Sequence, residues 1–150
     1  MTPAVEASTL DLAGLSDLLG FHLRLAHVAI YRDFMAALSD LDLTQKQCAT
    51  LQLVGANPGV SQVDIAATLG TDRATMMAMV DRLEERGLVV RTPSLVDRRR
   101  RELHLTPEGQ VVVRKAQAAI QRHESRFTSR LTKAQLETLI TALRVIHSQA

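Results

Sequence analysis

The chain has 150 residues, of which 46% are hydrophobic, and its formal net charge is +2. This is enough apolar material for one domain with its own core, and we expect no linker to divide the chain after its first few residues. Because 3% of the residues are aromatic and none is Trp, the composition argues against single-stranded nucleic-acid binding on stacked rings.

The first predicted element is a long helix over residues 11–38 that is apolar on more than one face. One stripe contains Leu18, Phe21, Leu25 and Val28, and another contains Leu19, Leu23, Ala26 and Ile30. The core of one subunit rarely uses both stripes of such a helix. We therefore expect part of this helix to contact a second copy of the chain.

A second helix is predicted to begin at Thr44, because Thr44 and Gln47 have the spacing of a capping box. The single cysteine, Cys48, lies on the side of this helix that we expect to face inward. One cysteine cannot form an internal disulfide framework, and a reactive thiol needs exposure and a nearby cation. We therefore favour a buried, inert thiol, with a redox-sensing thiol as the alternative.

Residues 60–87 predict two helices joined by a tight turn. In the first, Ser61 is the N-cap, Ile65 and Ala66 face inward together with Leu69, and Gly70 ends the helix. The second spans residues 71–87, with Thr71 as its cap, Asp72 at the positive end of the helix dipole and Gly87 as its left-handed end. Its inward stripe contains Met76, Met79, Val80 and Leu83.

This order of elements is the helix-turn-helix arrangement, in which the second helix enters the major groove of DNA by its N-terminal residues. In this chain those residues are Thr71, Asp72, Arg73, Thr75 and Met76.

A β-hairpin with a long tip is predicted after the second helix. Residues 88–90 form an apolar run, Pro93 and Ser94 break it, and residues 102–105 alternate as a half-buried strand does. The tip contains Asp97 and four consecutive arginines at positions 98–101, and Arg91 adds to this positive charge. An isolated arginine run is more often a solvated loop. Beside a capped helix, however, it suits duplex DNA, because guanidinium groups neutralise phosphates and fit a narrow minor groove.

Two helices are predicted at the C-terminus. The first begins at Thr106 with Pro107 in its first position, and the second begins at Thr132, which forms a capping box with Gln135. Their apolar stripes contain Val112, Ala116, Ala119, Ile120, His123 and Phe127, and then Leu136, Leu139, Ile140, Leu143 and Ile146. We expect both ends of the chain to pack together and against a second subunit. A symmetric homodimer would then place two recognition helices roughly 34–36 Å apart on a near-palindromic operator.

Four motifs along the chain are specific in combination, although each is weak alone. They are Ser61-Gln62-x-x-Ile65-Ala66, Val80-Asp81-Arg82-Leu83-Glu84-x-x-Gly87-Leu88-Val89, Asp97-Arg98-Arg99 and Leu103-x-Leu105-Thr106-x-x-Gly109. Together they resemble the MarR family of winged-helix transcription regulators, from about Leu12 onward. The resemblance implies a mostly α fold with a small β-hairpin wing. In a single domain, residues 44–105 would form the winged helix-turn-helix DNA-binding lobe, and residues 10–40 and 106–148 a helical dimerisation region.

The resemblance also implies which residues contact double-stranded DNA. Asp97 would order the wing tip and Arg99 would reach the DNA. The full predicted set is Ser61, Gln62, Thr71, Asp72, Arg73, Thr75, Met76, Asp97, Arg98, Arg99 and Arg100. Many members carry a basic or polar residue where this chain has Met77 and Ala78, so base readout is expected to depend on Arg73, Thr75 and Met76.

A small-molecule effector is implied by the same resemblance, commonly an aromatic or other anionic compound such as an aromatic acid or its thioester. It would bind where the dimer helices meet the DNA-binding lobe and release a repressor from its operator. The candidate residues are His22, Arg24, His27 and Tyr31. For His22 we favour a core histidine bonded to a backbone carbonyl, and for the other three a solvated helix face.

No motif indicates an enzyme, a cofactor or a metal site. The chain lacks a Gly-rich phosphate loop, a His-Glu-x-x-His run and a Gly-x-Ser-x-Gly elbow, and His22 and His27 are too far apart along a helix to share a metal. A winged-helix module that docks a protein is a further alternative, and the four arginines argue against it. Because we find neither a secretory signal nor a membrane-spanning run, we expect a cytoplasmic protein with no membrane partner.

Overall fold

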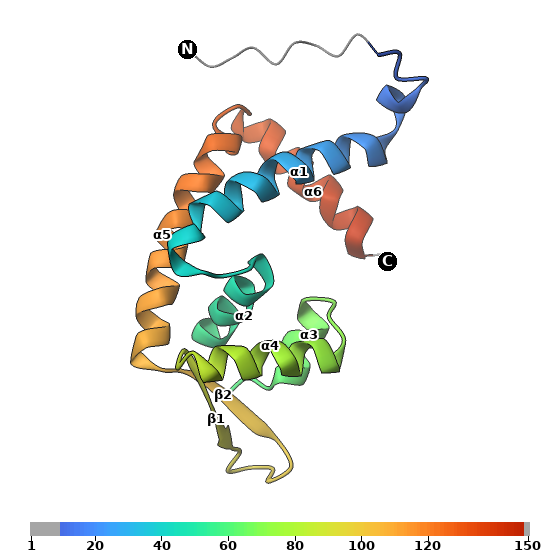
Figure 1. Ribbon diagram of the computed structural model, residues 1–150. Coiled ribbons are helices and arrows are strands. Elements are labelled where there is room, and N and C mark those ends of the chain that lie inside the picture. The colour runs from blue at the N-terminus through green and yellow to red at the C-terminus, as the bar shows by residue number, and fades with distance from the viewer. Residues whose placement is uncertain (1–9, 149–150) are drawn as a thin grey trace. The chain divides into compact units, whose positions relative to one another are not determined.

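The computed structural model describes residues 10–148, which fall into two compact units, residues 10–32 and residues 33–148. The elements in chain order are a 3-10 helix at Leu15–Asp17, α1 at Leu19–Ala37, a second 3-10 helix at Ser39–Leu41, α2 at Gln45–Ala56, α3 at Gln62–Thr68, α4 at Arg73–Glu85, β1 at Val89–Pro93, β2 at Arg101–Leu105, α5 at Pro107–Thr128 and α6 at Lys133–Ser148 (Figure 1). The fold is therefore mostly helical with one β-hairpin, as predicted. The grouping of residues 10–40 with residues 106–148 into one region stays a prediction.

The first unit contains the N-terminal part of α1, which begins later than predicted. Ala13 and Gly14 have φ values of 48° and 81°, so the backbone is left-handed there and cannot be helical. The expected start at Asp11 was therefore wrong, and the helix begins at Leu19. In the first stripe Leu18 is 54% exposed and Leu25 is 51% exposed, whereas Phe21 is partly buried.

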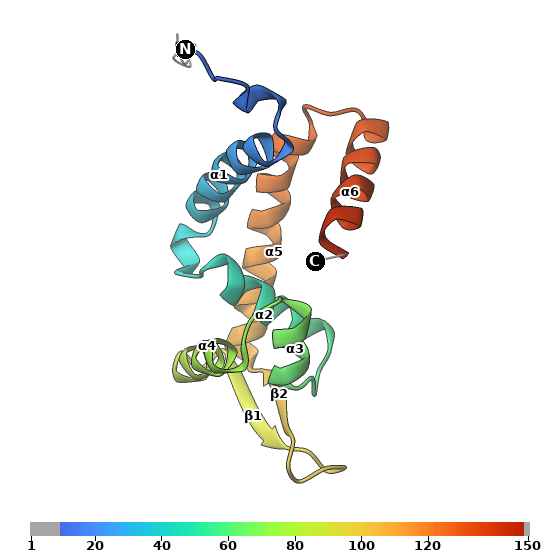
Figure 2. The ribbon, with the colours of Figure 1, turned by 90° about the vertical axis from the view of Figure 1, so that its right-hand side faces the viewer.

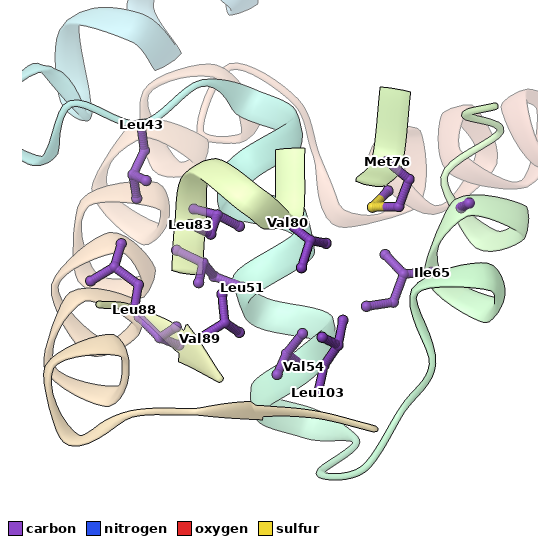
Figure 3. Close-up of a cluster of buried hydrophobic side chains, with 12 residues drawn as sticks. Leu43, Leu51, Val54, Ile65, Met76, Val80, Leu83, Leu88, Val89 and Leu103 are labelled. Atoms are coloured by element: carbon purple, nitrogen blue, oxygen red, sulfur yellow. The ribbon is translucent and has the colours of Figure 1, made fainter. Parts of the chain in front are cut away.

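The core of the second unit lies where α2, α3, α4, the hairpin and the start of α5 meet (Figure 3). Its buried residues are Leu43, Leu51, Val54, Ile65, Ala66, Met76, Val80, Leu83, Leu88, Val89, Leu103 and Val113. The α4 residues Met76, Val80 and Leu83 are fully buried, and burying a side chain of this kind contributes about 1.5–3 kcal/mol. These contacts fix which face of α4 points inward and which remains outside.

The helix ends in this unit follow the capping rules, with one correction. Asp72, rather than Thr71, is the N-cap of α4, because its Oδ1 accepts a hydrogen bond from the Thr75 amide at 2.9 Å. The Thr75 hydroxyl also donates to Asp72 Oδ2 at 2.6 Å. Hydrogen bonds from the hydroxyl and the amide of Thr75 hold the pKa of the Asp72 carboxyl below its usual value. Gly87 has a φ of 68°, which confirms the predicted left-handed end of α4, and Gly70, predicted to end α3, has a φ of 60°.

The predicted caps of the other helices are confirmed. Thr44 and Gln47 form a capping box, and the Ser61 side chain accepts from the Asp64 amide. Thr106 caps α5 before Pro107. The last box forms between Thr132 and Gln135, whose side chains each accept from the other's amide. These local signals place the starts of α2, α3, α5 and α6 correctly.

The hairpin is antiparallel and pairs Val89 with Leu105 at its base and Pro93 with Arg101 at its outer end. Its second strand is also held by the loop before α3, because the Leu103 amide donates to the Val60 carbonyl at 2.9 Å and the Gly59 amide donates to the Leu103 carbonyl at 2.9 Å. Both views show the hairpin extending beyond α3 and α4 (Figures 1 and 2). The wing is therefore anchored at its base and projects at its tip.

A second buried cluster joins the C-terminal end of α1 to α2 and α5, and its polar centre was not predicted. His123 is 1% exposed, and its Nδ1 lies 2.6 Å from Asp33 Oδ2. Arg126 donates to the other oxygen of Asp33 at 2.6 Å. The hydrogen bond from His123 and the charge of Arg126 hold the pKa of the Asp33 carboxyl below its usual value. The His123 ring also packs edge-on against Phe34.

Helix α6 has no buried residue among those described, although its apolar side chains repeat at helical spacing. Leu139 is 45% exposed and Ile146 is 46% exposed. No helix within residues 10–148 has the length and apolarity needed to cross a membrane.

Candidate nucleic-acid interface

The candidate site is formed by α3, α4 and the projecting hairpin. Residues 69–72 separate the two helices, and the Thr71 amide donates to the Ala66 carbonyl at 2.9 Å within this turn. Since α4 is oriented by its buried side chains, the outer face of its first two turns is open to solvent. This is the geometry of a helix-turn-helix, with the N-terminal end of the second helix free to meet a ligand.

The outer face of α4 contains Arg73 and Met77, which lie one turn apart and therefore on the same side. Met77 is 51% exposed, whereas Met76 is fully buried against the core. The prediction that Met76 contacts DNA was wrong, because the helical period that places Val80 inside also places Met76 inside. Met77 is the methionine that faces outward at this position.

The remaining predicted residues at this end of α4 are partly engaged with one another. Thr75 and Asp72 are hydrogen-bonded through both the amide and the hydroxyl of Thr75, so its hydroxyl can only accept from another partner. Thr71 is half-buried, and its hydroxyl lies 3.5 Å from the Leu69 carbonyl. Arg73 is exposed, so its guanidinium is accessible to a ligand at this end of the helix.

The wing tip is an ordered loop rather than a loose one. The buried Ser94 accepts hydrogen bonds at its Oγ from the amides of Val96 and Asp97, at 3.2 and 3.3 Å. Asp97 Oδ1 accepts from the Arg99 amide at 2.9 Å, and the Arg100 amide donates to the Asp97 carbonyl at 2.9 Å. Asp97 thus orders the tip, as the family resemblance implied, and its neighbour Arg99 is exposed.

Two arginines of the hairpin region, Arg91 and Arg100, form ion pairs with carboxylates of this chain. The guanidinium of Arg91 lies 2.6 Å from a carboxylate oxygen of Asp81 and 2.6 Å from one of Glu84, and its side chain is 18% exposed. Adding Arg91 to the free positive charge of the wing was therefore wrong. The two ion pairs join Arg91 of β1 to Asp81 and Glu84 of α4. These residues come close together only when the hairpin is folded.

Arg100 ties the wing tip to the start of α3. Its Nη2 lies 3.0 Å from Asp64 Oδ2 and 3.3 Å from Ser61 Oγ. Ser61 is only 8% exposed, and its hydroxyl also donates to Asp64 at 2.7 Å. The Ser61 hydroxyl is therefore engaged within the protein, and the contact of Ser61 with DNA stays a prediction.

Four other arginines of α4 and the wing remain unpaired among the described residues. Arg73, Arg98, Arg99 and Arg101 are exposed, and within residues 10–148 their side chains have no ion pair or hydrogen bond. An open hollow of about 570 Å³ separates the wing from the helices, with Gln62, Val63, Met77 and Arg99 on its walls. We call Arg73, Arg98, Arg99 and Arg101 the free arginines. A surface that combines such cations with a protruding helix end can bind a polyanion.

The predicted effector residues all lie in the first unit. His22 Nε2 lies 2.7 Å from the Ser16 carbonyl oxygen, so the expected bond to a backbone carbonyl is present, although His22 is exposed rather than in a core. The rings of His27 and Tyr31 are stacked 5.7 Å apart, and Arg24 is exposed. Their role in binding an effector stays a prediction.

Cys48 is buried, with 2% of its surface exposed, and burial raises the pKa of its thiol. Both features oppose formation of the thiolate that a redox sensor requires. The structure therefore gives no support to the redox alternative. Among residues 10–148, no three His, Cys, Asp or Glu side chains are grouped in a way that could hold a metal ion.

Comparison with known proteins agrees with this geometry. A family model described as MarR family matches residues 41–100. The putative transcriptional regulatory protein for the hcr operon of Thauera aromatica is 37% identical over 132 residues, or 87% of this chain and 80% of that protein. The repressor CouR bound to a 23-mer DNA duplex has a TM-score of 0.87 and 40% identity, covering 93% of this chain and 99% of that one. CouR bound to p-coumaroyl-CoA has a TM-score of 0.83 and 38% identity, covering 92% and 97%.

Proposed function

Because the chain belongs to the MarR family of transcriptional regulators, we propose that it is a dimeric repressor that binds a near-palindromic DNA duplex and is released by a small aromatic or anionic effector. The observation that carries this proposal is the set of free arginines, which are exposed and unpaired at the start of α4 and at the wing. Nothing within the described part of the chain neutralises them. A phosphate backbone would do so while α4 lies in the groove.

The residues have different roles in this proposal. Arg73 and Met77 lie on the outer face of α4, where Arg73 can bind a guanine edge in the major groove and the Met77 thioether can contact a thymine methyl group. Arg98, Arg99 and Arg101 lie on or beside the wing tip, where they can contact phosphates or a narrow minor groove. The helix therefore supplies base preference and the wing supplies most of the affinity.

Arg99→Ala and Arg73→Ala are expected to weaken DNA binding in different ways. Arg99→Ala should lower affinity for every duplex alike and reduce the slope of log K against log salt by about 2, because a dimer loses one phosphate contact in each subunit. Arg73→Ala should cost about 1–3 kcal/mol at particular base pairs and relax preference there. Fluorescence anisotropy with a selected operator and a random duplex, at several salt concentrations, measures both effects.

A change in the DNA tests the contact proposed for Met77 on the same face of α4. Deoxyuridine in place of thymidine removes only the methyl group, so the wild type should lose affinity at the positions that Met77 contacts and Met77→Ala should not. If Arg73→Ala weakened binding to operator and random duplex equally, the assignment of base readout to this face of α4 would be wrong.

The proposed effector is an aromatic acid or its thioester. Support comes from the neighbour CouR, whose structure with p-coumaroyl-CoA resembles this chain over 92% of its length. A ligand of the folded state at 100 times its dissociation constant should stabilise the protein by about 2.7 kcal/mol, which raises its melting temperature. We therefore expect a hit when aromatic acids and their coenzyme A thioesters are screened by thermal shift. A hit that left operator affinity unchanged would contradict an effector role, because regulation requires different affinities for the two states.

A further inference from the structure

The wing tip carries two apolar side chains that none of the contacts described above explains. Leu95 is fully exposed and Val96 is 97% exposed. Single exposed apolar residues are common, but these two are adjacent and lie in the loop between β1 and β2. Figure 2 shows that this hairpin projects from the helices. A loop that only had to stay soluble would carry polar residues there.

The backbone holds this pair outward. Ser94 Oγ accepts from the Val96 amide at 3.2 Å, and the Ser94 amide donates to the Arg100 carbonyl at 3.1 Å, which closes the loop behind the two side chains. Arg100 in turn is fastened to Asp64 at 3.0 Å. The apolar pair is therefore presented on a prearranged support, so that little conformational entropy is lost when it contacts a partner.

The neighbours of the pair indicate the chemistry of that partner. Three of the free arginines, Arg98, Arg99 and Arg101, lie within a few positions of Leu95 and Val96 along the chain. The minor groove of duplex DNA combines negatively charged phosphate rims with a floor of base edges and sugars, and apolar wedges enter it in proteins that bend DNA. The phosphates of the groove can therefore pair with the arginines, while its less polar floor can contact Leu95 and Val96.

We propose that Leu95 and Val96 insert into the minor groove at the outer side of each half-site and press against the base edges there, partly unstacking one base step. This inference rests on the proposed function and adds a residue-level source of sequence preference to it. Because the guanine 2-amino group projects from the floor of the minor groove, the contact favours A·T pairs at the flanks of the operator. In this arrangement the arginines contact the phosphates at the edges of the minor groove, and Leu95 and Val96 contact the base edges at its floor.

The test compares Leu95→Ser/Val96→Thr with the matched control Leu95→Met/Val96→Ile, which keeps the tip apolar. The probe is a duplex that the wild-type protein selects from a random 30-bp library, in its natural form and with 2,6-diaminopurine replacing the flanking adenines. This replacement adds an amino group to the minor-groove floor and leaves the phosphates unchanged. Wild type and control should bind the modified duplex about tenfold more weakly, a typical loss for one base contact.

The polar variant should bind both duplexes equally and keep the salt dependence of the wild type, because its arginines are intact. It should also bend the natural duplex less in a fluorescence energy-transfer measurement. If it retained wild-type discrimination and bending, the apolar tip would not enter the groove, and a protein partner would be the remaining occupant. Failure of the wild type to select any duplex would instead overturn the proposed function itself.

Discussion

Leu139→Asp is expected to split the dimer and to lower the affinity for a two-half-site operator by about 10²–10⁴-fold, because the second half-site is then no longer bound intramolecularly. The reason lies in α6, which has no buried residue within the described chain. Leu139 and Ile140 are 45% and 41% exposed, and Ile146 is 46% exposed on the same stripe. A second subunit that covers this stripe would leave the new carboxylate buried and unpaired, which is costly.

Light scattering after gel filtration measures the first effect, and binding to duplexes with one or two half-sites measures the second. Thr138→Asp adds the same charge to the same helix on a different face and should leave both unchanged. A Leu139→Asp protein that remained a dimer at micromolar concentration would show that α6 does not form the interface.

Gly109→Ala is expected to destabilise the second unit by about 3 kcal/mol, the upper end of the range for overpacking a core. Gly109 is buried in the first turn of α5, and an added Cβ would collide with the backbone oxygen of Leu88. That oxygen already accepts from the Thr106 amide at 3.1 Å, and the Leu88 side chain is buried in the core. Relief therefore requires a shift of α5 against β1 rather than a side-chain rotation.

Urea unfolding followed by circular dichroism measures this effect. Gly20→Ala is the matched control, because a Cβ at that helical position meets nothing within 4 Å and should leave stability unchanged or raised. If both variants unfolded at the wild-type midpoint, α5 would not pack tightly against the base of the hairpin.

Most of the local structure could be predicted from the sequence because its signals are local. The caps at Thr44, Ser61, Thr106 and Thr132, and the left-handed ends at Gly70 and Gly87, depend on residues at most a few positions apart. The late start of α1 had a signal as well, since Gly14 precedes Leu19. The apolar residues at helical spacing continue to the N-terminal side of Gly14, and they led to the expected start at Asp11.

The errors at the site have two different physical origins. The inward stripe predicted for α4 already contained Met76 with Val80 and Leu83, so its assignment to DNA conflicted with the helical period. The loss of Arg91 as a free cation could not, because it depends on how β1 returns past Asp81 and Glu84. A count of arginines in the sequence gives the total charge, and only the fold shows which of these charges are already paired.

The pairing of Asp33 with His123 and Arg126 had no sequence signal either. These residues are about 90 positions apart, and His123 fits an apolar helical stripe when it is taken alone. Such a pair becomes visible only when α1 and α5 are placed beside each other within the second unit.

The salt dependence of DNA binding by the wild-type protein tests most directly whether a dimer binds duplex DNA through the free arginines. The measurement is the affinity for a duplex fragment selected from its own genome, between 50 and 300 mM salt. We predict retention at low salt and a linear fall of log K with log salt. The slope should approach about −5 if Arg98, Arg99 and Arg101 of both subunits contact phosphates, at about 0.9 per contact. Absence of binding at low salt, or an affinity that does not change with salt, would contradict DNA binding through these arginines.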